Sequence, residues 1–475
     1  MKRILILGLT ILILFSFPFM DKAWAAEDTV KALADAAATA QTSGDTAFML
    51  LSAALVLLMT PGLAFFYGGF VRSRNILNTL MMSFLLMALV GVTWVLWSYS
   101  FAFAPGLSFF GGLQWLFGNI GLDSNGYLPR MAYEAGLPDD KVLTSYAATI
   151  PHQTFMIYQC MFAVITPALI SGAIVERLRF KAYFWFVLLW STIVYNSLAH
   201  MVWAKGGFLG LYGGLGALDF AGGTVVHISS GISALVAAWV IGPRRTELYQ
   251  PSPPHNVPFI LLGAGLLWFG WFGFNAGSAL ASGSLATVAF VATNSATAAA
   301  ALTWIVLEWV LRGKPTAVGF ATGAVAGLVG ITPAAGFVTP IGALLIGSIT
   351  AFICFLAVNF KARIHFDDTL DVCSIHGVGG TMGAILTGVF ATKAVNPVGA
   401  NGLLFGNPSQ VLIQLTAVMV AYGVAAVGTF VILKVLALFM TLRVKTQLEI
   451  EGVDLSEHGE VGYGEDLAGE ISLSS

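Results

Sequence analysis

Long uncharged apolar stretches recur along almost the whole chain, and they restrict its fold more than any other feature. A helix needs roughly 20 mostly apolar residues to cross the hydrocarbon core of a membrane. The sequence contains eleven stretches that meet this need. Of its 475 residues, 57% are hydrophobic and only 10% are charged, whereas soluble domains carry about 25% charge. The pattern predicts an all-α, polytopic membrane protein with eleven transmembrane helices.

Charged residues and helix breakers set the limits of these helices. Two pairs of helices each share one uncharged stretch, divided at residues 275–284 and at residues 332–340. The other seven are expected at about residues 46–71, 78–103, 151–175, 182–203, 222–242, 370–392 and 410–442. Together they define a membrane domain of residues 46–442 and a C-terminal tail of residues 443–475.

The N-terminus has the pattern of a secretory signal. Lys2 and Arg3 precede an apolar run, and Ala23-Trp24-Ala25 supplies the small residues of a cleavage site. We therefore expect a signal peptide of residues 1–25, followed by a short periplasmic tail of residues 26–45. An uncleaved extra helix is the alternative.

The distribution of basic residues predicts the orientation. With the N-terminus outside, thirteen Lys and Arg residues fall in the cytoplasmic connections and the start of the C-terminal tail, against five on the external side. Such an excess is the positive-inside pattern. The chain is therefore expected in the inner membrane, among its lipids, with a periplasmic N-terminus and a cytoplasmic C-terminus.

Charge and cysteine content argue against several other classes of protein. The formal net charge is −2, so no basic field points to nucleic acid. Cys160, Cys354 and Cys373 lie in apolar stretches, with no spacing typical of a disulfide framework or a metal site. The spans contain no paired carboxylates and no nucleophile–base set. No cofactor, metal or enzymatic activity is expected.

Two segments suggest an internal repeat. Eleven helices divide into two halves of five and one additional helix. Because five helices cross the membrane an odd number of times, the second half would start on the opposite side and be inverted relative to the first. Residues 218–227 and 370–381 each contain Leu-Asp, one histidine and Gly-Gly-Thr, pairing Asp219 with Asp371. Inverted repeats place a transport site near the midplane, between the halves.

Two histidines stand out within the spans. His227 and His376 lie well inside their helices without a neighbouring charge, and an ionisable group in a membrane helix is a functional hypothesis by default. Because the two helices would enter from opposite sides, their imidazoles could meet and pass a proton. The alternative is that each histidine only caps a carbonyl at a helix contact.

Ordered blocks of sequence resemble a known family almost from end to end. They are residues 162–177, 199–203, 217–227, 270–278, 327–333, 371–377, 451–454 and 458–460. In these blocks the chain resembles the Amt/Mep/Rh family of ammonium transporters, and its Amt branch in particular. The resemblance implies a homotrimer in which each subunit has its own pore for ammonium or ammonia.

The resemblance also implies a role for nine residues. His227 and His376 match the twin histidines of the pore. The others match an external ammonium recruitment site (Trp203 and Ser278, with Phe162), a stacked aromatic gate (Phe162 and Phe274), a further vestibule aromatic (Tyr158), an indole that flanks the pore (Trp271) and a buried entrance carboxylate (Asp219). For Asp219 we favour a capping role over contact with the ion. The connection between Trp203 and Asp219 is longer than the family pattern, so the outer vestibule is expected to differ in shape.

These roles predict a mechanism. An indole face attracts a cation by roughly 0.5–2 kcal/mol, and a dry aromatic constriction disfavours an ion far more than neutral ammonia. We expect NH4+ to be recruited outside and deprotonated, and NH3 to pass the histidines, with possible coupled proton transfer. The acidic tail is either disordered or, as the resemblance implies, folded against the cytoplasmic loops, where a PII-type protein could bind. An ammonium sensor, or a passive channel for CO2 or water, are the rival functions.

Overall fold

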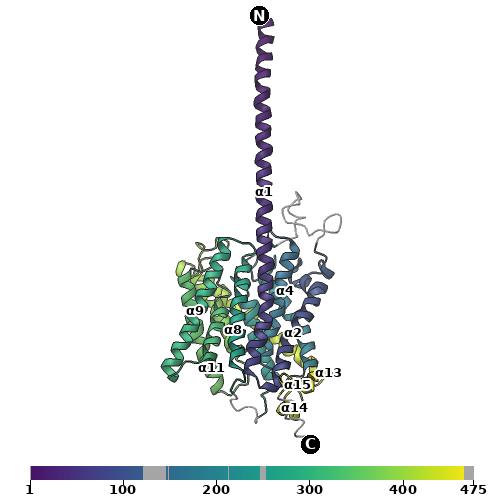
Figure 1. Ribbon diagram of the computed structural model, residues 1–475, viewed down its shortest axis with the longest axis vertical. Helices are drawn as coiled ribbons and strands as arrows, with labels where there is room; N and C mark the ends of the chain where they lie inside the picture. The colour runs from purple at the N-terminus through teal and green to yellow at the C-terminus, as the bar shows by residue number, and fades with distance from the viewer. Residues whose placement is uncertain (1, 121–145, 148, 212, 246–252, 465–475) are drawn as a thin grey trace.

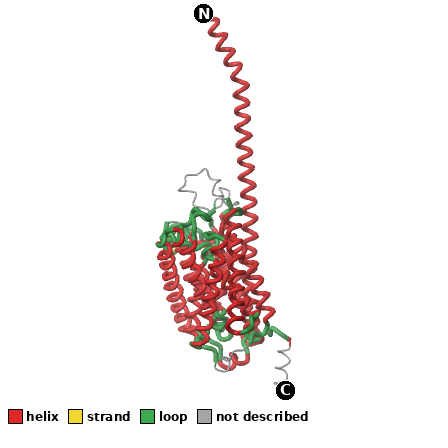
Figure 2. Tube along the Cα trace, turned by 90° about the vertical axis from the view of Figure 1, so that its left-hand side faces the viewer, coloured by secondary structure: helices red, strands yellow, loops and turns green. Residues whose placement is uncertain are grey.

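The chain folds into a bundle of long helices whose loops gather at its two ends (Figures 1 and 2). The computed structural model describes residues 2–120, 146, 147, 149–211, 213–245 and 253–464. Within these residues the only strands are β1 (Gly106–Leu107) and β2 (Phe110–Gly111), which form a small antiparallel hairpin. The predicted all-α class is confirmed.

Eleven apolar helices or helix groups account for the predicted spans of the described residues. Ten are long and apolar enough to cross a membrane, and the shorter α10 is the eleventh. The helices are α1 (Lys2–Phe70), α2 (Ile76–Thr93), α3 (Tyr99–Phe103), α4 (His152–Ser171), α5 (Phe180–Trp190), α6 (Asn196–Trp203), α7 (Ser229–Ile241), α8 (Val257–Ala276), α9 (Ser284–Arg312), α10 (Ala317–Ile331), α11 (Pro340–Arg363), α12 (Val378–Phe390), α13 (Ser409–Phe439), α14 (Thr446–Glu451) and α15 (Asp454–His458).

Short 3-10 and π segments connect or interrupt these helices. The 3-10 turns are η1 (Ser73–Asn75), η3 (Leu116–Gly118), η7 (Gly277–Ala279) and η9 (Leu403–Phe405). Two π segments interrupt membrane helices, η2 (Trp94–Ser98) and η4 (Ser191–Tyr195), and two lie at the start of such helices, η5 (Gly223–Ile228) and η8 (Cys373–Gly377). Since π turns are rare and concentrate at functional sites, η5 and η8 are of interest: they carry His227 and His376.

Helix α1 extends well beyond the bundle at one end, and α14 and α15 lie at the other (Figure 1). The two ends of the chain lie on opposite faces of the bundle, because an odd number of helices crosses it. Residues 27–41 of the predicted periplasmic tail (26–45) are exposed in the projecting part of α1, whereas Asp45 is buried and accepts the N–H of Ser282 at 2.8 Å. Cleavage of a signal peptide is not tested by this arrangement and stays a prediction.

Reciprocal contacts relate the two halves of the bundle. Helices α4 and α10 both end early, and each is followed by an irregular turn that runs to the bundle end. After α4, the carbonyl of Gly172 accepts the N–H of Leu370 at 3.0 Å, just before the tenth helix. After α10, the carbonyl of Pro333 accepts the N–H of Phe220 at 3.1 Å, just before the fifth helix. These matched contacts agree with an inverted repeat.

Candidate functional site

The two histidines meet in the centre of the bundle. Nδ1 of His376 lies 3.2 Å from Nδ1 of His227, and the ring centroids are 5.3 Å apart with an interplanar angle of 24°. Their residues are only 4% and 1% exposed. The imidazoles come from η8 and η5, far apart in sequence, so the convergence expected from the sequence is present.

Glycines allow the two histidine-bearing helices to approach this closely. A Cβ on Gly231 would lie 2.1 Å from the backbone nitrogen of Gly377, and one on Gly380 would lie 2.9 Å from the Cβ of His227. Both distances are too short for any side chain, and small residues at helix contacts are typical of membrane bundles. Gly231 and Gly380 are therefore needed for the hydrogen bond between the imidazoles.

The hydrogen bond constrains the protons of the pair. Only one of the two Nδ1 atoms can donate, so neutral rings in this bond must be opposite tautomers. Among the described residues, Nε2 of His227 is buried without a hydrogen-bond partner. A buried polar atom left unpaired is costly, and this one lies in the cavity between the halves. It is available to a small solute that can donate or accept a hydrogen bond.

An indole covers one of the imidazoles. The ring of Trp271 stacks on that of His227, with centroids 5.3 Å apart and planes 18° apart. Its N–H donates to Oγ1 of Thr332 at 2.9 Å, and that hydroxyl donates to the carbonyl of Leu328 at 2.7 Å. Sequence reasoning gave Thr332 no role, although a threonine directly before Pro333, at the break after α10, could have drawn attention to it.

Two stacked phenylalanines lie between the histidines and a cavity that is lined by Trp203 and Ser278. Phe162 and Phe274 have centroids 4.2 Å apart and an interplanar angle of 32°. Phe274 also faces His227, with centroids 6.2 Å apart. Both phenylalanines are at most 1% exposed, so the described side chains leave no open channel at this level.

Tyr158 lies behind these phenylalanines, which differs from its expected place in the vestibule. Its residue is fully buried, and its ring packs edge-on against Phe162 with centroids 5.0 Å apart. The hydroxyl donates to the carbonyls of Gly273 at 3.0 Å and Phe274 at 2.8 Å, and it lies 3.2 Å from Oγ of Ser278. The polar contact expected of this hydroxyl is therefore made to the protein, because α8 passes too close to leave it exposed.

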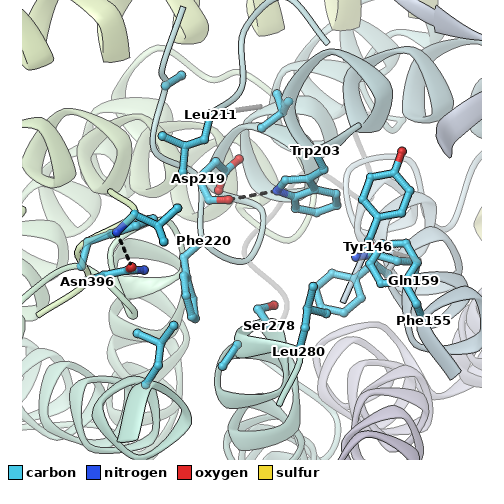
Figure 3. Close-up of a pocket in the computed structure, with 17 residues that line it drawn as sticks. Tyr146, Phe155, Gln159, Trp203, Leu211, Asp219, Phe220, Ser278, Leu280 and Asn396 are labelled. Atoms are coloured by element: carbon cyan, nitrogen blue, oxygen red, sulfur yellow. Dashed lines mark hydrogen bonds between the residues drawn. The ribbon is translucent and has the colours of Figure 1, made fainter. Parts of the chain in front are cut away.

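A cavity of about 280 Å³ lies at the end of the bundle from which α1 projects, and it is called the outer cavity here. Figure 3 shows the side chains that line it. Phe162, Trp203, Asp219 and Ser278 line it, so the residues expected to recruit ammonium are gathered at one place. Leu211, from the long connection after Trp203, also lines it, which places that connection in the vestibule wall. Lining residues that sequence reasoning missed are Tyr146, Phe155, Gln159, Phe220 and Asn396, none of which belongs to a polar motif.

Trp203 is fixed in this cavity by its indole N–H. That group donates to the backbone carbonyl of Asp219 at 2.9 Å (Figure 3). The indole also stands edge-on to Phe162, with centroids 5.9 Å apart and planes 87° apart. With its N–H engaged, the indole can offer a solute only its π system.

The carboxylate of Asp219 caps the fifth helix. It accepts the N–H groups of Gly222 at 2.8 Å, Gly223 at 2.5 Å and Thr224 at 2.8 Å, and it also accepts the hydroxyl of Thr224. Asp219 is 7% exposed. Most of its acceptor capacity is therefore used by the protein, which agrees with the capping role favoured from the sequence.

The matching cap on the tenth helix is Asp368, and the pairing of Asp219 with Asp371 was wrong. Asp368 accepts the N–H groups of Val372 at 3.1 Å and Cys373 at 2.7 Å. It stands eight residues before its histidine, as Asp219 does. Asp371 instead forms an ion pair with Lys361 at 2.7 Å and has a φ of 59°. The shared Leu-Asp dipeptide was a poor guide to the cap. A capping carboxylate is defined by the free backbone N–H groups that it accepts, not by the leucine that precedes it in sequence.

Two further cavities continue the path beyond the phenylalanines. The first, of about 10 Å³, is lined by apolar side chains with His227, His376 and Trp271. This volume is at the lower limit for one water molecule. The second, of about 190 Å³, opens toward the end with the C-terminal tail and reaches from Glu308 and Asp371 up to His376. His376 lines both, so the imidazole pair stands between two larger cavities.

Comparisons with known proteins agree on one family. The family model described as the Ammonium Transporter Family matches residues 47–463. The chain belongs to the ammonium transporter family. It is 48% identical to an ammonium transporter of Bacillus subtilis, over 89% of this chain and 99% of that protein. Among solved structures, it is similar to Saccharomyces cerevisiae Mep2 (TM-score 0.76, 35% identity, 85% of this chain and 88% of that one). It is also similar to a sensor Amt protein (TM-score 0.76, 27% identity, 88% and 99%).

The described part of the transporter's tail is folded, as the family resemblance implied. Glu449 is fully buried and pairs with Arg443 at 2.7 Å, while its carboxylate also accepts the N–H of Arg245 at 2.9 Å. Asp454 accepts the N–H groups of Leu77 at 2.9 Å and Asn78 at 2.8 Å, at the start of α2. The alternative of a disordered tail is therefore wrong for residues 443–464.

An ionic network joins the loops under the tail. Glu176 pairs with Arg244 at 2.7 Å and with Arg72 at 3.4 Å, and Arg244 pairs with Asp367 at 3.0 Å. Burial opposes ionisation of Glu176, but the two arginines outweigh it and hold its pKa below the usual value. For Asp368, next to this network, burial is the dominant cause and raises its pKa to about 6.

Proposed function

We propose that the transporter recruits NH4+ in the outer cavity, removes a proton at the aromatic gate and conducts NH3 past His227 and His376. The supporting observation is the imidazole pair, hydrogen-bonded at 3.2 Å in a lumen of about 10 Å³ that is otherwise lined by apolar side chains. Moving an ion into such a space costs far more than moving a neutral molecule. Ammonia fits the space and can hydrogen-bond to the imidazoles.

Recruitment would rest on three side chains of the outer cavity. The π systems of Trp203 and Phe162 attract a cation by roughly 0.5–2 kcal/mol. The hydroxyl of Ser278 donates to the carbonyl of Phe274 at 2.9 Å, which leaves its oxygen lone pairs free to accept an N–H bond. A cation with N–H groups satisfies both kinds of contact.

The imidazole pair offers a route for the released proton. A proton added to the outer nitrogen of one ring can be compensated by loss of a proton from the other, through the shared Nδ1–Nδ1 bond. Ammonia would then be reprotonated in the cavity beyond His376. Transport coupled in this way carries net charge, whereas NH3 alone does not.

An ammonium pulse onto proteoliposomes tests the mechanism, with current and internal pH recorded together. We expect wild type to carry current, His227→Ala to lose it, and Trp203→Ala to need more ammonium for half-maximal rate. His365→Ala, in the exposed loop after α11, is the control and should behave as wild type. A pH change without current in wild type would favour a passive gas channel, and an undiminished current in His227→Ala would contradict the role of the pair.

We further propose that the transporter is a homotrimer of the inner membrane, with its N-terminus periplasmic and residues 1–25 removed as a signal peptide. Thirteen basic residues against five support the orientation. The folded tail, α14 with α15, offers a cytoplasmic surface to a PII-type regulator. Light scattering of the purified protein tests the trimer, N-terminal sequencing tests the removal of residues 1–25, and pull-down with a PII-type protein tests the regulator.

A further inference from the structure

One lysine of a membrane-spanning helix has no part in the pore described above. Lys434 is the only charged residue of α13, which has 31 residues (Ser409–Phe439). It is exposed on the outer face of that helix, among apolar side chains such as Val431 (50% exposed) and Leu438 (81%). A charge on the lipid-facing side of a span is costly and therefore rare.

Lys434 has no carboxylate partner among the described residues. Its contact is with an aromatic pair: Nζ lies 5.5 Å from the centroid of Phe430, and Phe430 stacks on Trp239 with centroids 5.9 Å apart and planes 23° apart. Trp239 belongs to α7 and is 66% exposed. Its indole N–H likewise has no acceptor among the described residues. Two unused hydrogen-bond donors from different helices thus flank one exposed ring.

The position along the helices places this group at the edge of the membrane. Lys434 stands five residues before the end of α13 at Phe439, which is about 7.5 Å at 1.5 Å per residue. Trp239 stands two residues before the end of α7 at Ile241. A lysine at this depth extends its ammonium toward the headgroups, and tryptophan prefers the same level. Both helix ends lie on the side of the C-terminal tail.

We propose that Lys434, Trp239 and Phe430 form a binding site for the phosphate headgroup of an anionic phospholipid. The ammonium supplies charge and hydrogen bonds to the phosphate, and the indole N–H supplies a further donor. The exposed apolar face of α13 continues from the site into the hydrocarbon and accommodates an acyl chain. A lipid is favoured over a free phosphate ion because the site lies on the face of a membrane span, where the acyl chain adds apolar contact.

A lipid at this site would bridge α13 and α7, the helix that directly follows the π turn of His227. Helix α7 continues the segment of His227, and α13 is bonded to it through Thr429, whose hydroxyl lies 2.8 Å from Oγ of Ser233. Helix α13 also reaches the helix of His376 through Tyr422, 2.8 Å from Oγ1 of Thr381. The lipid is therefore expected to stabilise the contact between α7 and α13.

The test measures lipid binding to the purified full-length protein by native mass spectrometry. Phosphatidylglycerol, phosphatidylcholine and glycerol phosphate are titrated against wild type, Lys434→Met, Lys434→Arg and Trp239→Leu. We expect wild type to prefer phosphatidylglycerol over phosphatidylcholine about five-fold, the equivalent of about 1 kcal/mol for one basic residue at an anionic surface. Lys434→Met should lose the preference, Lys434→Arg should keep it, and Trp239→Leu should weaken it.

Lys314→Met is the matched control, because Lys314 is exposed at the same end of the bundle but outside the spans. It should keep the preference of wild type. The proposal is overturned if Lys434→Met retains the preference for phosphatidylglycerol. Equal competition by glycerol phosphate would indicate a free-anion site instead. A change of oligomeric state in Lys434→Met with unchanged lipid preference would assign this face to a subunit contact.

Discussion

Buried hydroxyl groups around the pore fall into two kinds, those that hold the gate and those without a partner. Tyr158 and Thr332 each bond to groups that carry the aromatic lining. By contrast, the hydroxyls of Tyr183 and Thr350 have no hydrogen-bond partner among the described residues. Removing a paired hydroxyl leaves its partner unsatisfied, whereas removing an unpaired one costs little. Matched substitutions can therefore separate positioning from general stability.

Tyr158→Phe is expected to weaken ammonium recruitment. The change removes the hydroxyl that donates to the carbonyls of Gly273 and Phe274 and lies beside Oγ of Ser278. The ammonium concentration for half-maximal transport should rise about 2- to 10-fold, the equivalent of about 0.5–1.5 kcal/mol for one hydrogen bond. Tyr183→Phe serves as the control and should leave this concentration and the stability unchanged. Equal effects of both changes would contradict a specific role for Tyr158.

Thr332→Val is expected to slow transport with little effect on recruitment. Valine has the shape of threonine but cannot accept the indole N–H of Trp271, so the indole loses its fixed position over His227. The maximal rate should fall several-fold while the concentration for half-maximal rate stays near that of wild type. Thr350→Val, which removes an unpaired buried hydroxyl, should change neither quantity. A higher half-maximal concentration in Thr332→Val would place the residue in recruitment instead.

At the scale of elements, each histidine-bearing helix begins with a capped π turn. Asp219 caps η5, and Asp368 caps η8, each eight residues before its histidine. The caps satisfy N–H groups that the helix itself leaves free, inside a bundle where water is scarce. The two carboxylates thereby set where each helix starts, and hence the height at which each imidazole lies.

Asp368→Ala is expected to damage the transporter more than Asp371→Ala. Loss of the cap leaves the N–H groups of Val372 and Cys373 unpaired and should cost about 0.5–2 kcal/mol, lowering both the thermal midpoint and the transport rate. Asp371 is partly exposed, and among the described residues it forms one ion pair, with Lys361, so its loss should cost less. Thermal unfolding in detergent, together with uptake in proteoliposomes, compares the two. A larger effect of Asp371→Ala would restore the pairing of Asp371 with Asp219.

The raised pKa of Asp368 predicts a pH-dependent stability. Its pKa rises from 3.8 to about 6, mainly through burial, so the folded state holds the proton more tightly than the unfolded state. The contribution of Asp368 to stability should therefore fall as the pH rises through about 4 to 6, and stay constant above that. Asp368→Asn does not titrate, so its thermal midpoint should lack this component. Parallel pH profiles of wild type and Asp368→Asn would rule it out.

At the scale of the whole molecule, the tail and the loops beneath it form one connected structure. Arg72 donates to the carbonyl of Glu449 at 2.6 Å and pairs with Glu176, which in turn pairs with Arg244. Arg244 pairs with Asp367, next to the cap of the tenth helix. Movement of the tail is therefore expected to displace the start of the helix that carries His376.

Glu449→Gln is expected to loosen the tail. The change leaves Arg443 without its buried partner at a cost of about 1–2 kcal/mol, less than for a fully buried pair because Arg443 remains partly exposed. Trypsin cleavage at the exposed Lys445 should accelerate about 5- to 30-fold. Glu451→Gln, at an exposed position of the same helix, is the control and should cleave at the rate of wild type.

The sequence by itself determined the elements that the membrane dictates. In lipid, each backbone N–H and carbonyl must be paired within its own helix, so an apolar run of sufficient length specifies a span wherever the rest of the chain lies. This local rule is why eleven spans could be predicted and why His227 and His376 could be placed inside helices.

Only the tertiary structure decided which side chains meet. The hydroxyl of Tyr158 turns toward α8, Thr332 holds Trp271, and Asp368 rather than Asp371 caps the tenth helix. Each of these contacts depends on how closely two helices approach each other, as they do at Gly231 and Gly377. It also depends on which backbone N–H groups the helices leave free. Hydropathy and spacing describe one helix at a time, and these distances arise only when the helices pack together.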